Sequence, residues 1–190
     1  MISSQHIVVT GTTRGIGASL MAKLAVSNTV IPLNRPVYDL SDITTLSNID
    51  FTSADCLILN AADETLGSFV DVDFVHLNRM IQVNLVGNLY LIQQYLRQRN
   101  TGTVAIITSR LAYEPTGSAC VYSLTKTALS KTISNLKLEY PAFRFVEIAP
   151  SRTRETDKDS CTEKKVSSYQ QVADAIVYAL FNTKIDSIRL

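Results

Sequence analysis

The 190-residue chain is long enough to bury one substantial core, since 46% of its residues are hydrophobic, and it is short for two domains. Its 18 basic and 17 acidic residues nearly cancel without a basic run, which argues against a nucleic-acid or membrane-surface partner. The three cysteines share no metal-ligand spacing, and neither a signal peptide nor a bilayer-spanning apolar run is recognisable. We expect a single domain over residues 1–190, located in the cytoplasm, without a bound metal.

Short apolar runs rich in β-branched residues recur along the chain, at residues 7–10, 30–33, 56–59, 104–108 and 145–148. Amphipathic stretches typical of helices occupy residues 16–26, 74–97, 123–139 and 170–180. Continuously apolar strands separated by helices are typical of a parallel sheet that is covered on both faces. The pattern predicts an α/β domain with a doubly wound parallel sheet, the Rossmann fold.

A glycine-rich turn, Thr-Gly-Thr-Thr-Arg-Gly-Ile-Gly at residues 10–17, directly follows the first predicted strand. Glycine permits a tight turn and a close backbone approach, and the helix that begins behind it offers free N–H groups to a phosphate. Because strand, turn and helix occur in the order that a dinucleotide site requires, we expect a pyrophosphate to bind here. The alternative is a glycine turn with a structural role alone.

The residues after this turn bear on the choice of cofactor. From Ala18 to Tyr38 there is no Asp or Glu, although an acidic residue in this region normally holds the ribose 2′-hydroxyl of NAD. Arg14 and Arg35 could instead hold a 2′-phosphate by charge-assisted hydrogen bonds. The sequence therefore favours NADP(H), with NAD(H) still possible and with either arginine merely solvated as the alternative.

A second set of polar residues could carry chemistry. Tyr122 and Lys126 lie four positions apart, which places both on one face of a helix, and Ser109 ends the fourth predicted strand. Asn84 is a polar residue within an apolar helical run and requires a partner. Ser109, Tyr122 and Lys126 could converge on one carbonyl group. We also expect the lysine charge to lower the tyrosine pKa by roughly 3 units, before desolvation subtracts from that shift.

The motifs together resemble the classical short-chain dehydrogenases/reductases. The matches are the turn at residues 10–17, Leu-Asn-Ala-Ala-Asp at 59–63, Asn84, Ser109, Tyr-Ser-Leu-Thr-Lys at 122–126 and Ala-Pro-Ser at 149–151. The resemblance implies that Tyr122 is the general acid or base, Ser109 binds the substrate oxygen, and Lys126 holds the nicotinamide ribose. It also implies that Asn84 anchors a water in a proton relay to Lys126.

The resemblance and the turn together define a candidate cofactor site. Its residues are Gly11, Thr13, Arg14, Gly15, Ile16, Gly17, Arg35, Asp39, Leu40, Asn60, Ala61, Ala62, Tyr122, Lys126, Pro150 and Thr153. Asp39 and Leu40 resemble the pair that flanks adenine in the family.

The sequence also departs from the family pattern. Asp63 and Ser151 replace glycines, and Glu155 stands where a threonine is expected, with Thr153 nearby. The interval between Leu33 and Asp39 is too short for a crossover helix, so we expect the second crossover helix to be absent and the third strand to be lost or reduced. A compact adenine pocket lined by Arg35 and Leu40 could compensate. The polar segment 152–168 is either a solvated loop or a small lid over a ligand.

The sequence thus predicts an NADP(H)-dependent oxidoreductase that interconverts a small carbonyl and an alcohol by hydride transfer. Family resemblance implies a homodimer or tetramer through the two long helices. The alternative is a non-catalytic NADP(H)-binding sensor or regulatory protein of the same fold. Arg110, Arg152 and Arg154 either select an anionic substrate or are solvated.

Overall fold

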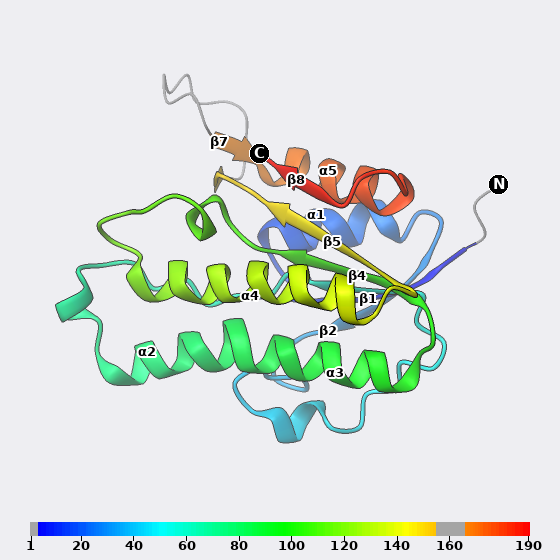
Figure 1. Cartoon of the computed structure of the whole chain (residues 1–190), viewed down its shortest axis with the longest axis horizontal. Helices are drawn as coiled ribbons and strands as arrows, with labels where there is room; N and C mark the ends of the chain where they lie inside the picture. The colour runs from blue at the N-terminus through cyan, green and yellow to red at the C-terminus, as the bar shows by residue number, and fades with distance from the viewer. Residues whose placement is uncertain (1–3, 155–165) are drawn as a thin grey trace.

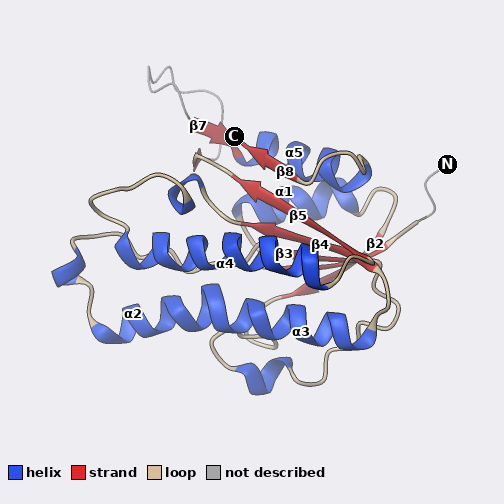
Figure 2. Ribbon diagram, viewed as in Figure 1, coloured by secondary structure: helices blue, strands red, loops and turns tan. Residues whose placement is uncertain are grey.

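A central parallel sheet organises the computed structural model, which describes residues 4–154 and 166–190 (Figures 1 and 2). In this part of the chain the sheet has six strands. Their spatial order is β2 (Thr29–Leu33), β1 (His6–Thr10), β3 (Cys56–Leu59), β4 (Gly102–Ile107), β5 (Phe143–Ala149) and β8 (Ser187–Arg189). All neighbours pair in parallel, which confirms the predicted doubly wound sheet.

Helices cover both faces of the sheet, so the molecule has three layers (Figure 1). Helices α1 (Gly15–Leu24) and α5 (Tyr169–Phe181) lie together on one face. The other face carries α2 (Phe74–Ile81), the π-helical segment η3 (Gln82–Gly87), α3 (Asn88–Gln98) and α4 (Cys120–Glu139). Because side chains alternate along a strand, Ile7 and Val9 enter the core under α1 and α5, while Val8 enters the core under α3 and α4.

The predicted helix at residues 74–97 forms as one rod with a π-helical middle. Asp73 begins it as an N-cap, since its side chain accepts a 2.9 Å hydrogen bond from the N–H of His76. The π segment contains Asn84, which is fully buried. Single π turns inside α-helices are frequent at functional sites, because they redirect side chains and free backbone groups.

The connection from β2 to β3 is shorter than a crossover that contains a helix and a further strand. Within the described residues it contains only a 3-10 helix, η1 (Ile43–Leu46), and no strand lies beyond β2. The connection instead packs against the helical rod: a Cβ atom added to Gly87 would lie 2.4 Å from the Leu40 carbonyl oxygen. The predicted loss of the crossover helix and of the third strand is confirmed.

Three short strands near the C-terminus were absent from the sequence prediction. Strand β8 extends the sheet beside β5, and β6 (Arg152–Arg154) pairs with β7 (Val166–Ser168) in a separate parallel ribbon. Helix α5 then begins with a capping box between Ser168 and Gln171. The middle of the predicted loop or lid, including Glu155, lies outside the described residues. No helix that the structure describes combines the length and hydropathy needed to cross a membrane.

Candidate active site

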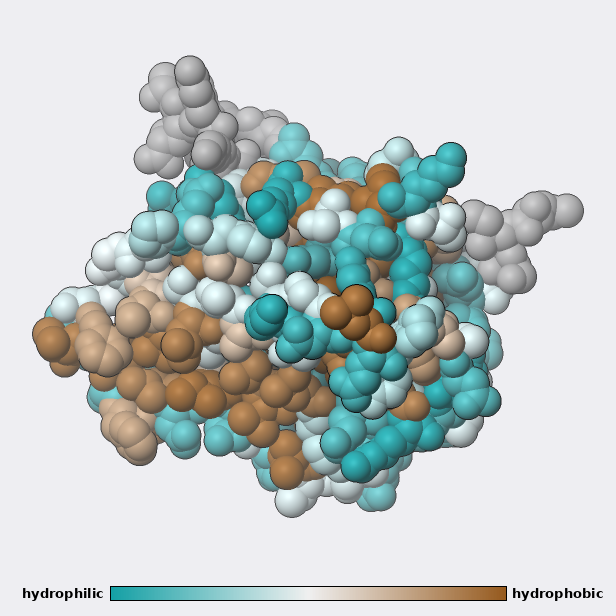
Figure 3. Space-filling model, in the orientation of Figure 1, coloured by the Kyte–Doolittle hydropathy of each residue, from teal (hydrophilic) through white to brown (hydrophobic). Residues whose placement is uncertain are grey.

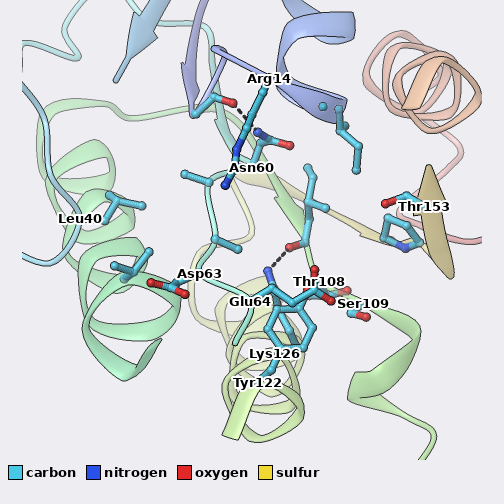
Figure 4. A pocket seen from close by; sticks show the side chains of 18 of the residues that line it. Arg14, Leu40, Asn60, Asp63, Glu64, Thr108, Ser109, Tyr122, Lys126 and Thr153 are labelled. Carbon is cyan, nitrogen blue, oxygen red and sulfur yellow. Dashed lines mark hydrogen bonds between the residues drawn. The ribbon is translucent and has the colours of Figure 1, made fainter. Parts of the chain in front are cut away.

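The predicted site residues meet at the carboxyl edge of the sheet, around a cleft of about 1610 Å³. Sixteen predicted residues line this cleft, and Gly17 and Asn84 lie behind its surface. In Figure 4, Leu40 and Asp63 lie on one side, Arg14 and Asn60 lie at the glycine turn, and Ser109, Tyr122, Lys126 and Thr153 lie at the far end. Ligands of doubly wound sheets bind at this edge.

The glycine turn has the conformation that its sequence predicts. Gly11 and Gly15 have φ values of 69° and 58°, a region that side chains disfavour. A Cβ atom on Gly17 would lie only 1.9 Å from the Gly11 carbonyl oxygen, so Gly17 supports the turn from behind. Arg14 caps α1 without a side-chain hydrogen bond in the described structure, which leaves the first N–H groups of α1 for a ligand.

Asn60 fixes the floor of the cleft. Its side-chain Nδ2 donates to the carbonyl oxygens of Thr10 and Gly11, at 3.1 and 2.8 Å. In return, Thr10 Oγ1 accepts from the N–H groups of Asn60 and Ala61, each at 3.0 Å. These bonds join the end of β3 to the glycine turn after β1, so the two segments cannot move independently.

The β2 side of the cleft depends on a residue that sequence reasoning missed. Asn34 Oδ1 accepts from the N–H of Thr12 at 2.8 Å, and Asn34 Nδ2 donates to Thr12 Oγ1 at 2.9 Å. These two hydrogen bonds hold the glycine turn against the start of the short connection. Arg35, next in the chain, is exposed at the cleft together with Arg14. The signal in the sequence was an Asn at the end of a strand, a position where its amide can bond a neighbouring turn.

The far end of the cleft contains Tyr122 and Lys126 on the first turns of α4. Tyr122 is 9% exposed and Lys126 is 2% exposed. Lys126 Nζ donates a 2.9 Å hydrogen bond to the Ile107 carbonyl oxygen at the end of β4, and it lies 5.5 Å from the centre of the Tyr122 ring. Ser109 follows β4 and lies near enough to Tyr122 to act on the ionisation of its phenol. The predicted convergence of these side chains is therefore present.

The pKa values correct one expectation. Burial raises the pKa of Tyr122 well above its usual value, the charge of Glu64 adds to this, and the side chain of Ser109 opposes it only in part. The expected lowering by Lys126 was wrong, because desolvation of the buried phenol outweighs the lysine charge. Burial also lowers the pKa of Lys126 to about 8, against an opposing effect of Glu64.

Asn84 acts on the backbone of the cleft from behind. Its Oδ1 accepts from the N–H of Asp63 at 2.7 Å, and its Nδ2 donates to the Asp63 carbonyl oxygen at 2.8 Å and to Thr125 Oγ1 at 3.2 Å. The partner that its buried amide required is thus the segment after β3. Asn88 Nδ2 also donates to the Asn84 carbonyl oxygen, at 2.9 Å.

Acidic residues of the cleft were only partly anticipated. Asp63 was noted as a departure, but its partner was not: Arg79 Nε donates to Asp63 Oδ2 at 2.8 Å. Glu64 was missed altogether, although it lines the cleft beside Tyr122 and Lys126 (Figure 4). The sequence carried no signal for either contact, since both depend on how the segment after β3 leaves the sheet.

The segment after β5 completes the far end. Pro150, Ser151 and Thr153 line the cleft, and the Pro150 carbonyl oxygen accepts a 2.8 Å hydrogen bond from the N–H of Arg110. Arg110 also forms an ion pair with Glu114 at 3.3 Å. Among the described residues, no group of three His, Cys, Asp or Glu side chains could hold a metal ion.

The doubly wound sheet, the glycine turn and the cleft at the carboxyl edge define a Rossmann-fold protein. Residues 39–166 match the family model described as short chain dehydrogenase. An uncharacterized oxidoreductase of Staphylococcus epidermidis is 30% identical over 212 aligned positions, which cover 94% of this chain and 92% of that protein. A Staphylococcus aureus oxidoreductase is 29% identical over 67% of this chain and 59% of its own length.

Solved structures agree in fold. A short chain dehydrogenase from Burkholderia cenocepacia in complex with NADP has a TM-score of 0.83 at 20% identity, covering 100% of this chain and 89% of that one. A ketone-specific alcohol dehydrogenase from Comamonas testosteroni has a TM-score of 0.85 at 20% identity, with coverages of 97% and 85%. The chain belongs to the short-chain dehydrogenase family and is an oxidoreductase of that family.

The buried lysine gives a prediction about stability. At pH 7 Lys126 is protonated in the folded and the unfolded protein, so folding must desolvate a charge. Lys126→Met removes this cost and should raise the free energy of unfolding by about 1–3 kcal/mol at pH 7. Between pH 8 and 10.5 the unfolded wild type binds more protons than the folded one, so wild-type stability rises and the difference should shrink.

Urea unfolding at pH 7 and pH 9.5 measures this effect, with Lys131→Met as the control. Lys131 is exposed on the same helix, so its replacement should change stability little at either pH. A Lys126→Met variant that is less stable than the wild type at pH 7, or whose advantage grows with pH, would contradict the assignment of a desolvated ammonium group.

Proposed function

We propose that the protein is an NADP(H)-dependent oxidoreductase that interconverts a carbonyl and an alcohol, with Tyr122 as the general acid or base. The observation that supports this most is the arrangement of one continuous cleft. A glycine turn and Arg14 lie at one end, and Ser109, Tyr122 and Lys126 lie at the other. A dinucleotide laid along the cleft would reach from the turn to these side chains.

Bound NADPH would supply a hydride to the carbonyl carbon of the substrate. Tyr122 Oη would give its proton to the carbonyl oxygen, so that the C=O bond becomes an alcohol and the atoms balance. Ser109 Oγ would hydrogen-bond the same oxygen and hold it against Tyr122. Lys126, positioned by its bond to the Ile107 carbonyl oxygen, would place a positive charge where negative charge develops.

The protein environment favours reduction. Burial holds the phenol of Tyr122 in its protonated form, which is the form that a general acid needs. Oxidation would need the phenolate, which the same burial opposes. Asn84 would act as a positioning residue, since its side chain is occupied by Asp63 and Thr125. A relay water could bind the main-chain carbonyl oxygen of Asn84, which also accepts a hydrogen bond from Asn88 Nδ2.

Removing the Tyr122 hydroxyl tests the proposed acid. Tyr122→Phe should lower kcat for NADPH-dependent reduction by about 100-fold or more while NADPH still binds, because proton transfer is lost and the cleft keeps its shape. Absorbance of NADPH against a panel of aldehydes, ketones and quinones measures turnover, and fluorescence titration measures binding. Tyr178→Phe is the control: Tyr178 is exposed on α5, so this variant should retain full activity.

Turnover by the wild type and by Tyr122→Phe distinguishes a wrong choice of acid from a protein that does not catalyse at all. Equal turnover by Tyr122→Phe and the wild type would remove the tyrosine from the mechanism. NADPH binding by the wild type without turnover of any compound in the panel would favour the non-catalytic sensor instead.

The preference for NADP(H) rests on Arg14 and Arg35, both exposed at the turn end of the cleft. The NADP-bound fold relative from Burkholderia cenocepacia is consistent with this preference. Arg35→Ala should raise the Kd for NADPH by about 10- to 100-fold, because a charge-assisted hydrogen bond to the 2′-phosphate is lost. The Kd for NADH, measured by the same fluorescence titration, should change less than 2-fold. Tighter binding of NADH than of NADPH by the wild type would contradict the preference.

We also propose that the protein is a homodimer that pairs through the layer of α2, α3 and α4. Exposed apolar side chains gather over α2 and towards α4 (Figure 3). The exposed apolar residues of this layer include Phe74 and Val75 on α2, Leu124 near the start of α4 and Leu138 near its end. An apolar surface of this kind on a soluble chain marks an interaction site. The 20.9 kDa chain should therefore sediment as a dimer.

Sedimentation velocity of Leu138→Lys against Val26→Lys tests the dimer surface. Both side chains are more than four-fifths exposed, but Val26 follows α1 in the opposite layer. A lysine at position 138 should shift the population towards monomer by burying a charge at the interface, and Val26→Lys should not. A wild type that is monomeric at micromolar concentration would contradict the proposal.

A further inference from the structure

We propose that the Asp63–Arg79 ion pair is the outer wall of the adenosine pocket. In this arrangement the Arg79 guanidinium contacts the adenine ring, and Asp63 holds that guanidinium in place. The inference rests on the proposed function, because it needs a nucleotide cofactor in the cleft. It assigns a binding role to two residues that the sequence comparison left without one.

The contact between the two side chains is fixed at both ends. Arg79 Nε donates to Asp63 Oδ2 at 2.8 Å, and the two side chains are 36% and 23% exposed. Asn84 binds both the N–H and the carbonyl oxygen of Asp63, so the main chain that carries the carboxylate cannot swing away. Arg79 is on α2, whose start is capped by Asp73. The guanidinium is thus held at the cleft before any ligand arrives.

The position of Arg79 points to the adenosine half. Arg79 and Val83 lie one turn apart on one helix face, and both line the cleft. One turn further, Gly87 lies directly against the carbonyl oxygen of Leu40. The positive charge of Arg79 also acts on the carboxylate of Asp39. Arg79 therefore faces the segment of Asp39 and Leu40, which is what remains of the connection that lost its crossover helix.

The pairing also decides what Arg79 offers to a ligand. Its Nε is used by Asp63, while within the described chain its two terminal NH₂ groups have no hydrogen-bond partner. A guanidinium whose charge is balanced by a carboxylate attracts a phosphate weakly, but its planar face still stacks on a purine. The ion pair also neutralises the carboxylate of Asp63, which would otherwise repel a cofactor that carries several phosphate charges.

Calorimetric titration with cofactor fragments measures whether Arg79 contributes to adenosine binding, and it does not depend on turnover. The probes are ADP, 2′,5′-ADP and nicotinamide mononucleotide. Arg79→Ala should weaken ADP and 2′,5′-ADP by the same factor, about 5- to 30-fold, and leave nicotinamide mononucleotide unchanged. Arg79→Lys keeps a positive charge but lacks the planar face, so it should weaken both adenosine fragments as well. Adding Asp63→Asn to Arg79→Ala should restore part of the lost affinity by removing the unpaired carboxylate.

Arg97→Ala is the matched control, because Arg97 is an exposed arginine on the same helical rod outside the cleft. A loss confined to 2′,5′-ADP would assign Arg79 to the 2′-phosphate and overturn the adenine contact. Unchanged ADP affinity in a folded Arg79→Ala or Arg79→Lys variant would make the ion pair merely structural. A wild type that binds none of the fragments and no NADPH would instead refute the proposed function itself.

Discussion

The hydrogen bonds of Asn60 are the constraint on which the cleft depends. They tie the end of β3 to Thr10 and Gly11, and so they set how far apart the glycine turn and the segment after β3 can be. In a parallel sheet the backbone ladder joins neighbouring strands, and that ladder stops where the strands end. Side-chain bonds beyond the last ladder pair are therefore what give the carboxyl edge a defined shape. Asn84 fixes the next part of this segment in the same way, because its side chain binds both the N–H and the carbonyl oxygen of Asp63.

Burial at the far end of the cleft has opposite effects on stability and on chemistry. The ammonium group of Lys126 belongs to a side chain that is 2% exposed, and it donates to one carbonyl oxygen. Its desolvation lowers the free energy of unfolding. The same desolvation strengthens the field that the charge exerts on a reacting oxygen. Tyr122 is affected in parallel, because burial keeps its phenol protonated. Residues of this kind are expected where function, and not packing, selects the side chain.

The sequence was a good guide wherever local pattern decides structure. The apolar strands β1 to β5, the glycine turn and the helix of Tyr122 and Lys126 were all predicted, because each follows from periodicity or from backbone preferences of nearby residues. Strand β8 was missed because its three residues carry no periodic signal, and it is ordered only by pairing with β5. The direction of the Tyr122 shift was wrong for a related reason, since desolvation depends on neighbours that only the tertiary structure specifies.

The cleft residues show the same division. Asn60, Ser109 and Lys126 could be placed from their motifs, whereas the partners of Asp63 and Asn34 lie 16 and 22 positions away with no motif between them. The path of each connection across the sheet edge decides which turn an amide or carboxylate side chain can reach. No short stretch of sequence specifies that path. The roles of the catalytic residues stay predictions until turnover is measured.

The shortened connection after β2 is supported by details on both sides of it. Loss of the third strand leaves β2 at the edge of the sheet, and β2 contains Pro32, which pairs with Val9. Proline lacks an N–H group, so it suits an edge strand and discourages pairing with a further strand. Gly87 meanwhile leaves room for Leu40 to approach the helical rod closely.

These adjustments change the residues that bound the proposed adenosine half of the cleft. Where a longer chain would place a strand and a crossover helix, this one has the exposed Arg35 on one side and the helical rod with Arg79 on the other. A pocket bounded in this way gains more of its affinity from arginine contacts and less from buried apolar area. Cofactor binding should accordingly depend more on ionic strength than in a member of the family with the full crossover, because the exposed charge of Arg35 is screened by salt.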